Sequence, residues 1–484
     1  MKNVILLDIS CTLVKTISQM EDINVEVAII GEADDKNINI DTGKFKEFYL
    51  YRGYDKKLDF YFNLNNKKLD LTYEEIEKFR HLQLEVEHFF LRTNNDISLS
   101  QNKYYQALSY WLNIFKTKKI DYVISPTIYH GELEEMAISI AKSFNVKVLV
   151  IETFSEMNSY YFYGVLNWNT KKYISIEDCS DSLSRVNKND VSFFPNKGDI
   201  YENSIINTSY STVFHKILYE LVGVIFTFSI IKILGRYNIT FLGSKIPLRV
   251  YFSGYFHNKS LIRYYNKNSI KKRKNEKYLY YSMTFDPEAV TLARSCVSSQ
   301  LTLIKMLAES VPDDVFIYVK DHPAYTMLNT ATYSYFLINN KNFRSKSYYD
   351  ELLKMRNVKL INMNESSEDL VKNSLALCTI TGSVIVETIF KYKKPIIMFD
   401  SKLSPMGMIK DIFKVRSTND CKQALKIICS DFVPTYNDFD SILKKYAFKA
   451  YSGTRDLMGK NDLRCLLKEI DKSSLDKSEN NNIK

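Results

Sequence analysis

The sequence predicts an α/β protein made of two Rossmann-like domains, and three observations support this fold class. Short apolar runs that suit buried parallel strands alternate with helical patterns. The alternation occurs twice, within residues 3–152 and again within residues 278–428. The chain of 484 residues is also too long for one ordinary domain, and an apolar content of 45% is normal for a globular protein.

The first half opens with two apolar runs that we expect to be buried strands, Asn3–Ile9 and Val25–Gly31. Two polar–apolar helical patterns follow, and then come a strand, a helix and another strand. Their expected ranges are about 72–91 and 103–115 for the first two helices, 121–126 for the strand, 132–144 for the helix and 146–152 for the last strand. This alternation predicts βαβ units and a parallel sheet.

The second half repeats the alternation more regularly. We expect five strands, at residues 278–283, 315–319, 358–362, 375–380 and 394–399. Helical patterns lie between and after them, at about 287–308, 348–355, 368–373, 384–392 and 421–428. Units of this kind are connected with right-handed chirality in nearly all proteins.

The remaining segments define the predicted domain boundaries. We expect an N-terminal domain over residues 1–258, a basic linker at 259–277, a C-terminal domain at 278–430, helices that pack back at 431–470 and a disordered tail at 471–484. The first domain includes an insertion with the apolar run Leu221–Ile231, which is shorter than the about 20 residues that span a bilayer. A buried helix is the favoured interpretation of this run, and a one-sided membrane contact is the alternative.

Charge and cysteine content narrow the class of partner. Lys and Arg exceed Asp and Glu by 66 − 56, a net charge of +10, which suits a phosphorylated ligand or an anionic membrane face and does not require nucleic acid. The linker carries eight Lys or Arg and one Glu, so anionic lipid is the alternative to a solvated linker. Seven Cys without a CxxC pair, and an early acid at Asp8, predict a cytoplasmic protein with reduced thiols.

The first candidate site follows the strand at 315–319, which ends in Lys320-Asp321-His322-Pro323. Pro323 disfavours the helical region for the residue before it, so we expect His322 to stay extended at the strand edge. There the imidazole can donate to a phosphate oxygen, with the charge of Lys320 nearby. The alternative is an ordinary turn, which most His-Pro pairs form.

The second candidate site is the turn Thr381-Gly382-Ser383 between a strand and a helix. Gly382 permits close approach of a ligand to the backbone, and Thr381 or Ser383 can cap the helix. The first N–H groups of the helix favour an anion, and Glu387, one turn later, can meet a ribose hydroxyl. The alternative is a capped helix with an exposed Glu.

These motifs resemble the capsular polysaccharide biosynthesis family. The resemblance covers residues 278–399 and rests on "YYSMTFDPEA", Gln300, "IYVKDHP", "NVKLIN" and "TITGSVIVETIFKYKKPIIMF", in that order. The family is similar to GT-B glycosyltransferases, and some members transfer Kdo. The resemblance implies that a His-Pro motif and a later Ser/Thr motif hold the phosphate of a CMP-activated sugar, here through His322, Pro323, Thr381 and Ser383, with Glu387 on the family's Glu. The chain departs from the family at Lys393, where glycine is usual, and at Ile385 and Val386, where an aromatic is expected.

The segment 121–152 resembles the acceptor domain of such enzymes more weakly. A transferase needs a base that takes the proton of an acceptor hydroxyl, and His130, Glu132 and Asp8 are the candidates. For Glu134 and Glu135 we favour a simpler role as acids that complement the dipole in the first turn of the helix.

The sequence contains no P-loop, GxSxG or HExxH motif, and no DxD at a strand end. We therefore expect metal-independent transfer without a cofactor, in a cleft between two domains of GT-B type. The expected reaction moves a sugar, Kdo or a sialic-acid-like one, from a nucleotide to a glycan or glycolipid of a bacterial surface polysaccharide. Further expected partners are the inner face of the membrane and capsule-assembly proteins. The alternatives are a GT-B-shaped UDP-sugar epimerase and a non-catalytic capsule assembly or export factor.

Overall fold

The structure is a computed structural model of the whole chain. It describes residues 1–31, 43, 45–51, 69–91, 97–125, 132–157, 160–176, 238–241, 244–286, 291, 295–322, 325, 343–399, 405–451 and 460–480. At some of these positions, Asp8 and Glu132 among them, only the backbone is described.

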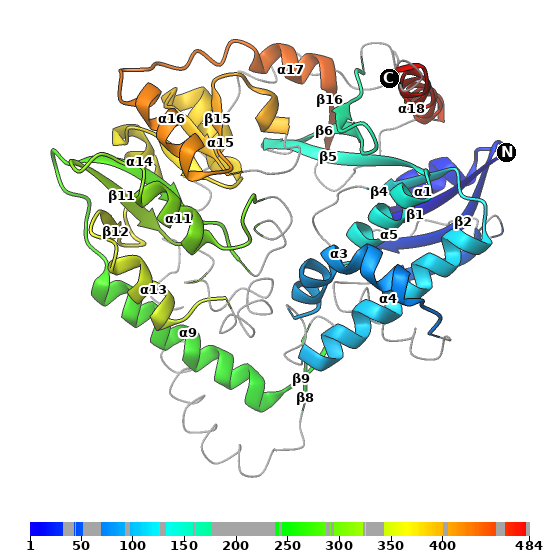
Figure 1. Cartoon of the computed structure of the whole chain (residues 1–484), viewed down its shortest axis with the longest axis horizontal. Helices are drawn as coiled ribbons and strands as arrows, with labels where there is room; N and C mark the ends of the chain where they lie inside the picture. The colour runs from blue at the N-terminus through cyan, green and yellow to red at the C-terminus, as the bar shows by residue number, and fades with distance from the viewer. Residues whose placement is uncertain are drawn as a thin grey trace.

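The first sheet has the strand order β3-β2-β1-β4-β5-β6-β16, with β7 paired to β6 (Figure 1). Its strands are β1 (Lys2–Ser10), β2 (Ile23–Gly31), β3 (Phe45–Tyr51), β4 (Tyr122–Ser125), β5 (Lys147–Met157), β6 (Tyr160–Asn167), β7 (Lys172–Tyr173) and β16 (Ala447–Tyr451). Pairing is parallel from β3 to β5, whereas β6 and β16 add antiparallel strands. The alternating pattern predicts β1, β2, β4 and β5 of this parallel part but not β3.

Helices cover both faces of this sheet. Along β1, Ile5 and Leu7 enter the same core as Trp111, while Val4 and Leu6 enter a second core, because successive strand residues point to opposite faces. The first core is closed by α3 (Tyr73–Leu91), α4 (Ile97–Thr117) and α5 (Glu132–Ser143), and the second by α1 (Cys11–Ser18) and α18 (Lys460–Asn480). Burial on both faces explains why the strands read as continuous apolar runs.

The second sheet is wholly parallel, with the order β12-β11-β10-β13-β14-β15. Its strands are β10 (Lys277–Ser282), β11 (Val315–Lys320), β12 (Val358–Leu360), β13 (Leu377–Thr379), β14 (Ile396–Met398) and β15 (Ile412–Lys414). Numbered along the chain, the order is 3-2-1-4-5-6, which is the order of a dinucleotide-binding Rossmann sheet. The first six strands of the first sheet have this same order.

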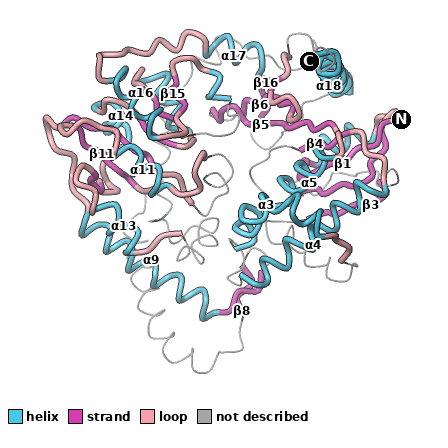
Figure 2. The backbone as a smooth tube through the Cα atoms, in the orientation of Figure 1, coloured by secondary structure: helices cyan, strands magenta, loops and turns pink. Residues whose placement is uncertain are grey.

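The helical segments of the second unit lie around this sheet (Figure 2). They are α9 (Leu248–Asn268), α11 (Gln300–Ala308), α13 (Lys346–Leu353), α14 (Ser367–Asn373), α15 (Ser383–Glu387), the π-helical turn η5 (Thr388–Tyr392), the 3-10 turn η6 (Pro405–Met408) and α16 (Thr418–Ile428). A hairpin of β8 (Asn238–Phe241) and β9 (Ser244–Pro247) precedes α9. The predicted fold class, α/β with two Rossmann-like units, is confirmed by the two sheets.

The C-terminal part of the chain returns to the first unit. After α17 (Phe439–Tyr446), β16 pairs antiparallel with β6, and α18 then packs on the first sheet. Asp471 of α18 accepts hydrogen bonds from Lys2 at 2.9 Å and Lys147 at 2.7 Å, and from the hydroxyl of Tyr122. These three donors begin β1, β5 and β4, so Asp471 ties the amino ends of three strands together.

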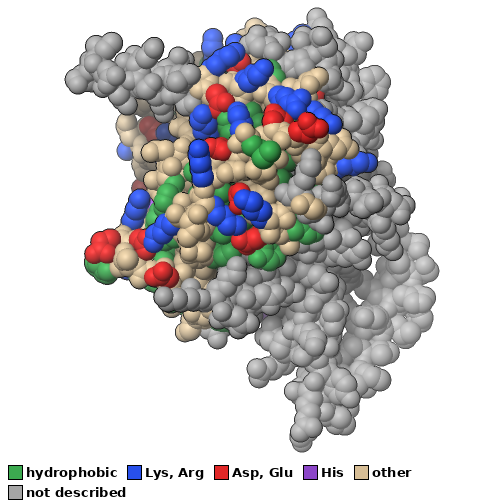
Figure 3. All heavy atoms as spheres, turned by 90° about the vertical axis from the view of Figure 1, so that its right-hand side faces the viewer, with side chains coloured by type: hydrophobic (Ala, Val, Ile, Leu, Met, Phe, Trp, Pro, Cys, Tyr) green, Lys and Arg blue, Asp and Glu red, His purple; other side chains and the backbone are tan. Residues whose placement is uncertain are grey.

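On the face drawn in Figure 3, positive and negative side chains are interspersed.

Four predicted segments differ from the structure. The range 431–470, expected to be helical, contains the strand β16 at Ala447–Tyr451. Residues 259–268 of the predicted linker are the last turns of α9, and Leu261 and Tyr265 are buried in the core of the second unit. Residues 471–480 of the predicted disordered tail continue α18. The single helix expected at 384–392 is α15 followed by η5.

The apolar run Leu221–Ile231 lies outside the described residues. Among the helices that the structure describes, none has both the length and the apolarity that crossing a bilayer requires.

Candidate nucleotide site and the edges of the two sheets

The strand order of the second sheet places a switch point between β10 and β13, because the chain runs outward from these two strands in opposite directions. Ligands of doubly wound sheets bind beyond the carboxyl ends of the strands at such a point. Here the hydroxyl of Thr379, at the end of β13, donates to the carbonyl of Ser282, at the end of β10, over 3.0 Å. The two strand ends are therefore held together where the candidate motifs leave the sheet.

Gly382 is the residue that turns the chain from β13 into α15. Its φ of 133° and ψ of 165° lie in a region that is open essentially only to glycine. An added Cβ would still find room, because the nearest atom, Cγ1 of Val384, would be 3.8 Å away. Glycine is thus required by backbone conformation rather than by lack of space.

The predicted capping of this helix by Thr381 or Ser383 is wrong. The N-cap is Gly382, which has no side chain to accept from the first N–H groups. Both Gly382 and Ser383 are exposed. The start of α15 consequently presents backbone donors without a side-chain cap, at the switch point.

Glu387 is the last residue of α15 and is half-buried. The helix then widens into η5, where the hydroxyl of Thr388 donates to the carbonyl of Val384 over 2.7 Å. Burial raises the pKa of Tyr280, and the negative charge of Glu387 adds to that rise. Glu387 closes α15, the helix that follows β13 at the switch point.

His322 follows β11, the strand on the other side of β10. Its backbone N–H donates to Oδ1 of Asp321 over 2.8 Å, and its ring centroid lies 5.7 Å from that of Phe285. Burial lowers the pKa of His322 to about 4, and the nearby charge of Lys320 contributes. The imidazole is thus neutral at pH 7, with one nitrogen as donor and the other as acceptor. Pro323 lies outside the described residues.

Lys320 is buried and already has protein partners. Its ammonium donates to the carbonyl of Glu365 at 2.6 Å and to the hydroxyl of Ser367 at 2.9 Å. The side chain therefore ties β11 to the start of α14, and its charge reaches His322 through space.

Next to His322 lies a buried charged cluster that the sequence motifs did not reveal. Arg344, just before α13, forms ion pairs with Asp286 and with Asp321, and all three side chains are largely buried. Gln300 donates to Asp286 over 2.5 Å. Asp286 and Asp321 belong to the quoted sequence motifs. Arg344 does not, because it follows the stretch 326–342, in which we predict no element, and therefore no signal in the sequence marked it.

The other candidates belong to the first half of the chain. Asp8 lies on β1 and Glu132 begins α5, but neither side chain is described, and His130 lies outside the described residues. Glu134 and Glu135 occupy the first turn of α5 as predicted, yet they are only 0% and 4% exposed. Complementing a helix dipole does not require such burial.

Glu152 of β5 is also buried, at 1% exposure. It lies two residues beyond Ser125–Val150, the last pair of β4 with β5. β5 extends past the end of β4 and contacts both α15 and η6 of the second unit (Figure 1). One strand of the first unit thereby reaches the helix that starts at Gly382.

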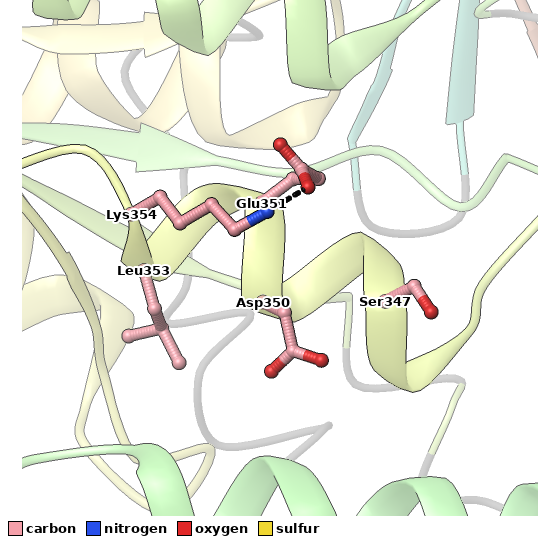
Figure 4. A pocket seen from close by; sticks show the side chains of 5 residues that line it. All are labelled: Ser347, Asp350, Glu351, Leu353 and Lys354. Carbon is pink, nitrogen blue, oxygen red and sulfur yellow. Dashed lines mark hydrogen bonds and ion pairs between the residues drawn. The ribbon is translucent and has the colours of Figure 1, made fainter.

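A separate surface pocket lies along α13. It is lined by Ser347, Asp350, Glu351, Leu353 and Lys354, and Figure 4 shows Lys354 turned toward Glu351. Tyr264 of α9 donates to Asp350 beside it. None of the predicted site residues lines this pocket, so it does not enter the proposed function.

No protein-family model matches the chain, and no curated protein matches its sequence. Among solved structures it resembles the KpsC β-Kdo 2,7 transferase of Thermosulfurimonas dismutans, at 14% identity over 66% of this chain and 79% of that one, with a TM-score of 0.26. It also resembles the UDP-GlcNAc 2-epimerase of Methanocaldococcus jannaschii, at 13% identity over 96% and 98% of the two chains, with a TM-score of 0.24.

A third solved structure is the α,α-trehalose-phosphate synthase of Burkholderia vietnamiensis. It is 8% identical, with coverage of 98% and 100% and a TM-score of 0.30. Superposition at these values is weak, so the two-unit α/β architecture rests on the strand orders of the chain itself.

Proposed function

We propose that this chain is a sugar-nucleotide enzyme, and that it transfers a sugar from a nucleotide to a glycan or glycolipid acceptor. The observation that carries the proposal is the position of the two candidate motifs on either side of β10 at the switch point. His322 follows β11 and Gly382 follows β13, so their strands are separated by roughly 10 Å, twice the spacing of paired strands. A bound nucleotide can bridge that distance.

The proposed chemistry is stabilisation of a leaving phosphate. Neutral His322 donates one hydrogen bond, and the N–H groups at the start of α15 donate others toward the same anion. Glu387 accepts from a ribose hydroxyl of the nucleoside. This arrangement needs no metal, in agreement with the lack of a DxD at a strand end.

The acceptor side belongs to the first unit. A base there removes the proton of the acceptor hydroxyl as the sugar–phosphate bond breaks. Asp8, His130 and Glu132 are our candidates. Asp8 lies near the carboxyl end of β1 and Glu132 begins α5, and His130 falls between β4 and α5 in the sequence. The contact of β5 with α15 supports a reaction between the two units.

The resemblance to the capsular polysaccharide biosynthesis family favours a CMP-linked donor, with Kdo or a sialic-acid-like sugar. A titration of CMP, UDP, GDP and dTDP against the protein tests this choice. We expect saturable binding of one nucleotide, strongest for CMP. If none of the four nucleotides binds, the proposal of a sugar-nucleotide enzyme is wrong, and a non-catalytic assembly or export factor is favoured.

Sugar-nucleotide epimerisation is the second candidate, and buried acids favour it. Epimerisation requires acid–base groups around the sugar, and Glu134, Glu135 and Glu152 are buried in the unit that faces α15. Product analysis with the nucleotide sugar alone separates the two activities. An epimerase converts the donor without an acceptor, whereas a transferase needs one.

A further inference from the structure

We propose that Arg344 is a positioning residue for His322 and acts on it through Asp321. Arg344 is 1% exposed and contacts two strand ends at once. Its Nη1 donates to Asp286, four residues after β10, and its Nε donates to Asp321, directly after β11, over 3.2 Å. A single guanidinium thus fixes the two chain segments that leave neighbouring strands beside the switch point.

Asp321 passes this restraint to the histidine. Its Oδ2 accepts from Nε of Arg344 and from the hydroxyl of Tyr349 at 2.5 Å, while its Oδ1 accepts from the backbone N–H of His322 at 2.8 Å. The same carboxylate therefore joins the guanidinium to the backbone of His322. Rotation of the Asp321 side chain would break the bond that orients the next residue.

The other contacts of Arg344 leave it little freedom to move. Its guanidinium carbon lies 4.5 Å from the ring centroid of Tyr348 and 5.3 Å from that of Tyr325. Asp286, its second acid, is held in turn by Gln300, which also exchanges two 2.9 Å hydrogen bonds with the backbone of Thr284. The planar fork is required because an ammonium has no rigid geometry to match two carboxylates.

The charges also exclude a simpler role for Arg344 as the phosphate ligand itself. Two carboxylates already compensate the guanidinium, and a phosphate placed there would meet both of them. Burial raises the pKa of Asp321 to about 7, against hydrogen bonds from Tyr349 and His322 that favour its ionised form. Loss of Arg344 would leave two buried acids without their cationic partner.

The inference rests on the proposed nucleotide site and is tested by a double-mutant cycle. The variants are Arg344→Lys, His322→Ala and the pair, with Arg356→Met as the matched control, because Arg356 is an exposed arginine of the same unit that pairs with Asp313. We expect Arg344→Lys to weaken binding of the preferred nucleotide roughly tenfold. When His322 is already alanine, adding Arg344→Lys should weaken nucleotide binding by less than about a further twofold.

Additive losses in the cycle would overturn the positioning role while leaving the proposed function intact. A second readout keeps the inference testable if no nucleotide binds, in which case the proposed function fails by itself. Histidine NMR should show the imidazole of His322 titrating near pH 4 in the native protein, because burial lowers its pKa. In Arg344→Lys the ring should titrate closer to its ordinary pKa, because a ring that is no longer held in position is less buried. An unchanged titration in a folded Arg344→Lys protein would also overturn the role.

Discussion

Among the charged clusters that tie strands together in the described part of the chain, two lie at opposite edges of their sheets. Arg344 with Asp286 and Asp321 joins segments at the carboxyl edge of the second sheet and is largely buried. Asp471 with Lys2 and Lys147 joins strands at the amino edge of the first sheet, and about a third of each carboxylate and ammonium is exposed.

Similar contacts therefore serve different purposes at the two edges. In parallel α/β sheets the loops at the carboxyl ends carry ligands, so a rigid cluster there orients functional groups. At the amino edge no ligand site is expected, and the cluster of Asp471 stabilises the fold by holding α18 on the sheet. Variants at the carboxyl edge of the second sheet should therefore change binding and turnover, and variants at Asp471 should change stability alone.

Gly382→Val should have the largest effect. Valine is strained at a φ of 133°, so the chain must leave its path at the start of α15. We expect turnover to fall by about a hundredfold or more, as a misplacement of about 1 Å can cause. Steady-state assays with circular dichroism measure this. Ser383→Ala is the control and should act mildly, because it leaves the backbone donors in place. If Gly382→Val folds and turns over at a near-normal rate, the phosphate does not bind at the start of α15.

Acidification should destabilise the protein through His322. Its pKa is about 4 in the native state, below the ordinary value of 6.5. The unfolded chain therefore gains a proton first, and stability falls as the pH drops from about 6.5 to about 4. The loss is at most about 3 kcal/mol, at 1.36 kcal/mol per pKa unit. Urea unfolding at several pH values should show a smaller loss in His322→Ala than in His81→Gln, a control on the exposed face of α3. Equal losses would contradict the assignment.

His322→Ala should weaken nucleotide binding by about 1–3 kcal/mol, the usual effect of losing a hydrogen bond to a charged group. Isothermal titration at pH 7 measures the difference. The same substitution should leave the unfolding midpoint at pH 7 close to that of the native protein, because the ring is half-buried and neutral there. Unchanged affinity would remove His322 from the site.

Asp471→Asn should lower stability and leave nucleotide affinity unchanged. Partial burial opposes ionisation of Asp471, but hydrogen bonds from Lys147, Tyr122 and Lys2 outweigh it and lower its pKa to about 2. The stabilisation is thus present above about pH 4 and is lost as the pH falls toward 2. We expect about 1 kcal/mol at pH 7 after allowance for solvent screening.

Glu469→Gln is the matched control for Asp471, because Glu469 pairs with Lys472 on the same helix. A change of nucleotide affinity in Asp471→Asn would break the contrast between the two sheet edges.

Lys393→Gly should have the smallest effect and should stabilise the protein. Lys393 is the residue directly after η5 and caps its C-terminal end. Its backbone lies in the left-handed region, at φ 47° and ψ 43°, which glycine adopts without strain. The expected gain is about 0.5–1 kcal/mol, measured by chemical unfolding. Lys394→Gly, one residue later and before Pro395, should instead lose stability, because that position favours extended backbone. A loss of stability in both variants would show that the side chain of Lys393 matters more than its conformation.

The sequence alone determined the elements whose signals are local. Apolar runs predicted four strands of the first sheet and five of the second, because burial on two faces leaves a continuous apolar stretch. The strands of these sheets that they did not predict are β3, β6, β7, β15 and β16. The turn at Gly382 was also readable, since glycine opens a region of φ that other residues avoid. The extended backbone expected at His322 before Pro323 stays a prediction. The position of Lys393 was visible as a replaced glycine, although its left-handed conformation was not.

Which segments meet in space is visible in the folded chain and not in its sequence. The pairing of Arg344 with Asp286 and Asp321 joins residues 58 and 23 positions apart, and no periodic pattern records such a contact. The pairing of β16 with β6 and the hydrogen bond of Lys2 to Asp471 join residues that are still further apart in the sequence. Hydrophobic periodicity reports which face of an element is buried, but not which partner buries it. Strand order and charged clusters depend on that choice of partner, and it is made by packing across the whole chain.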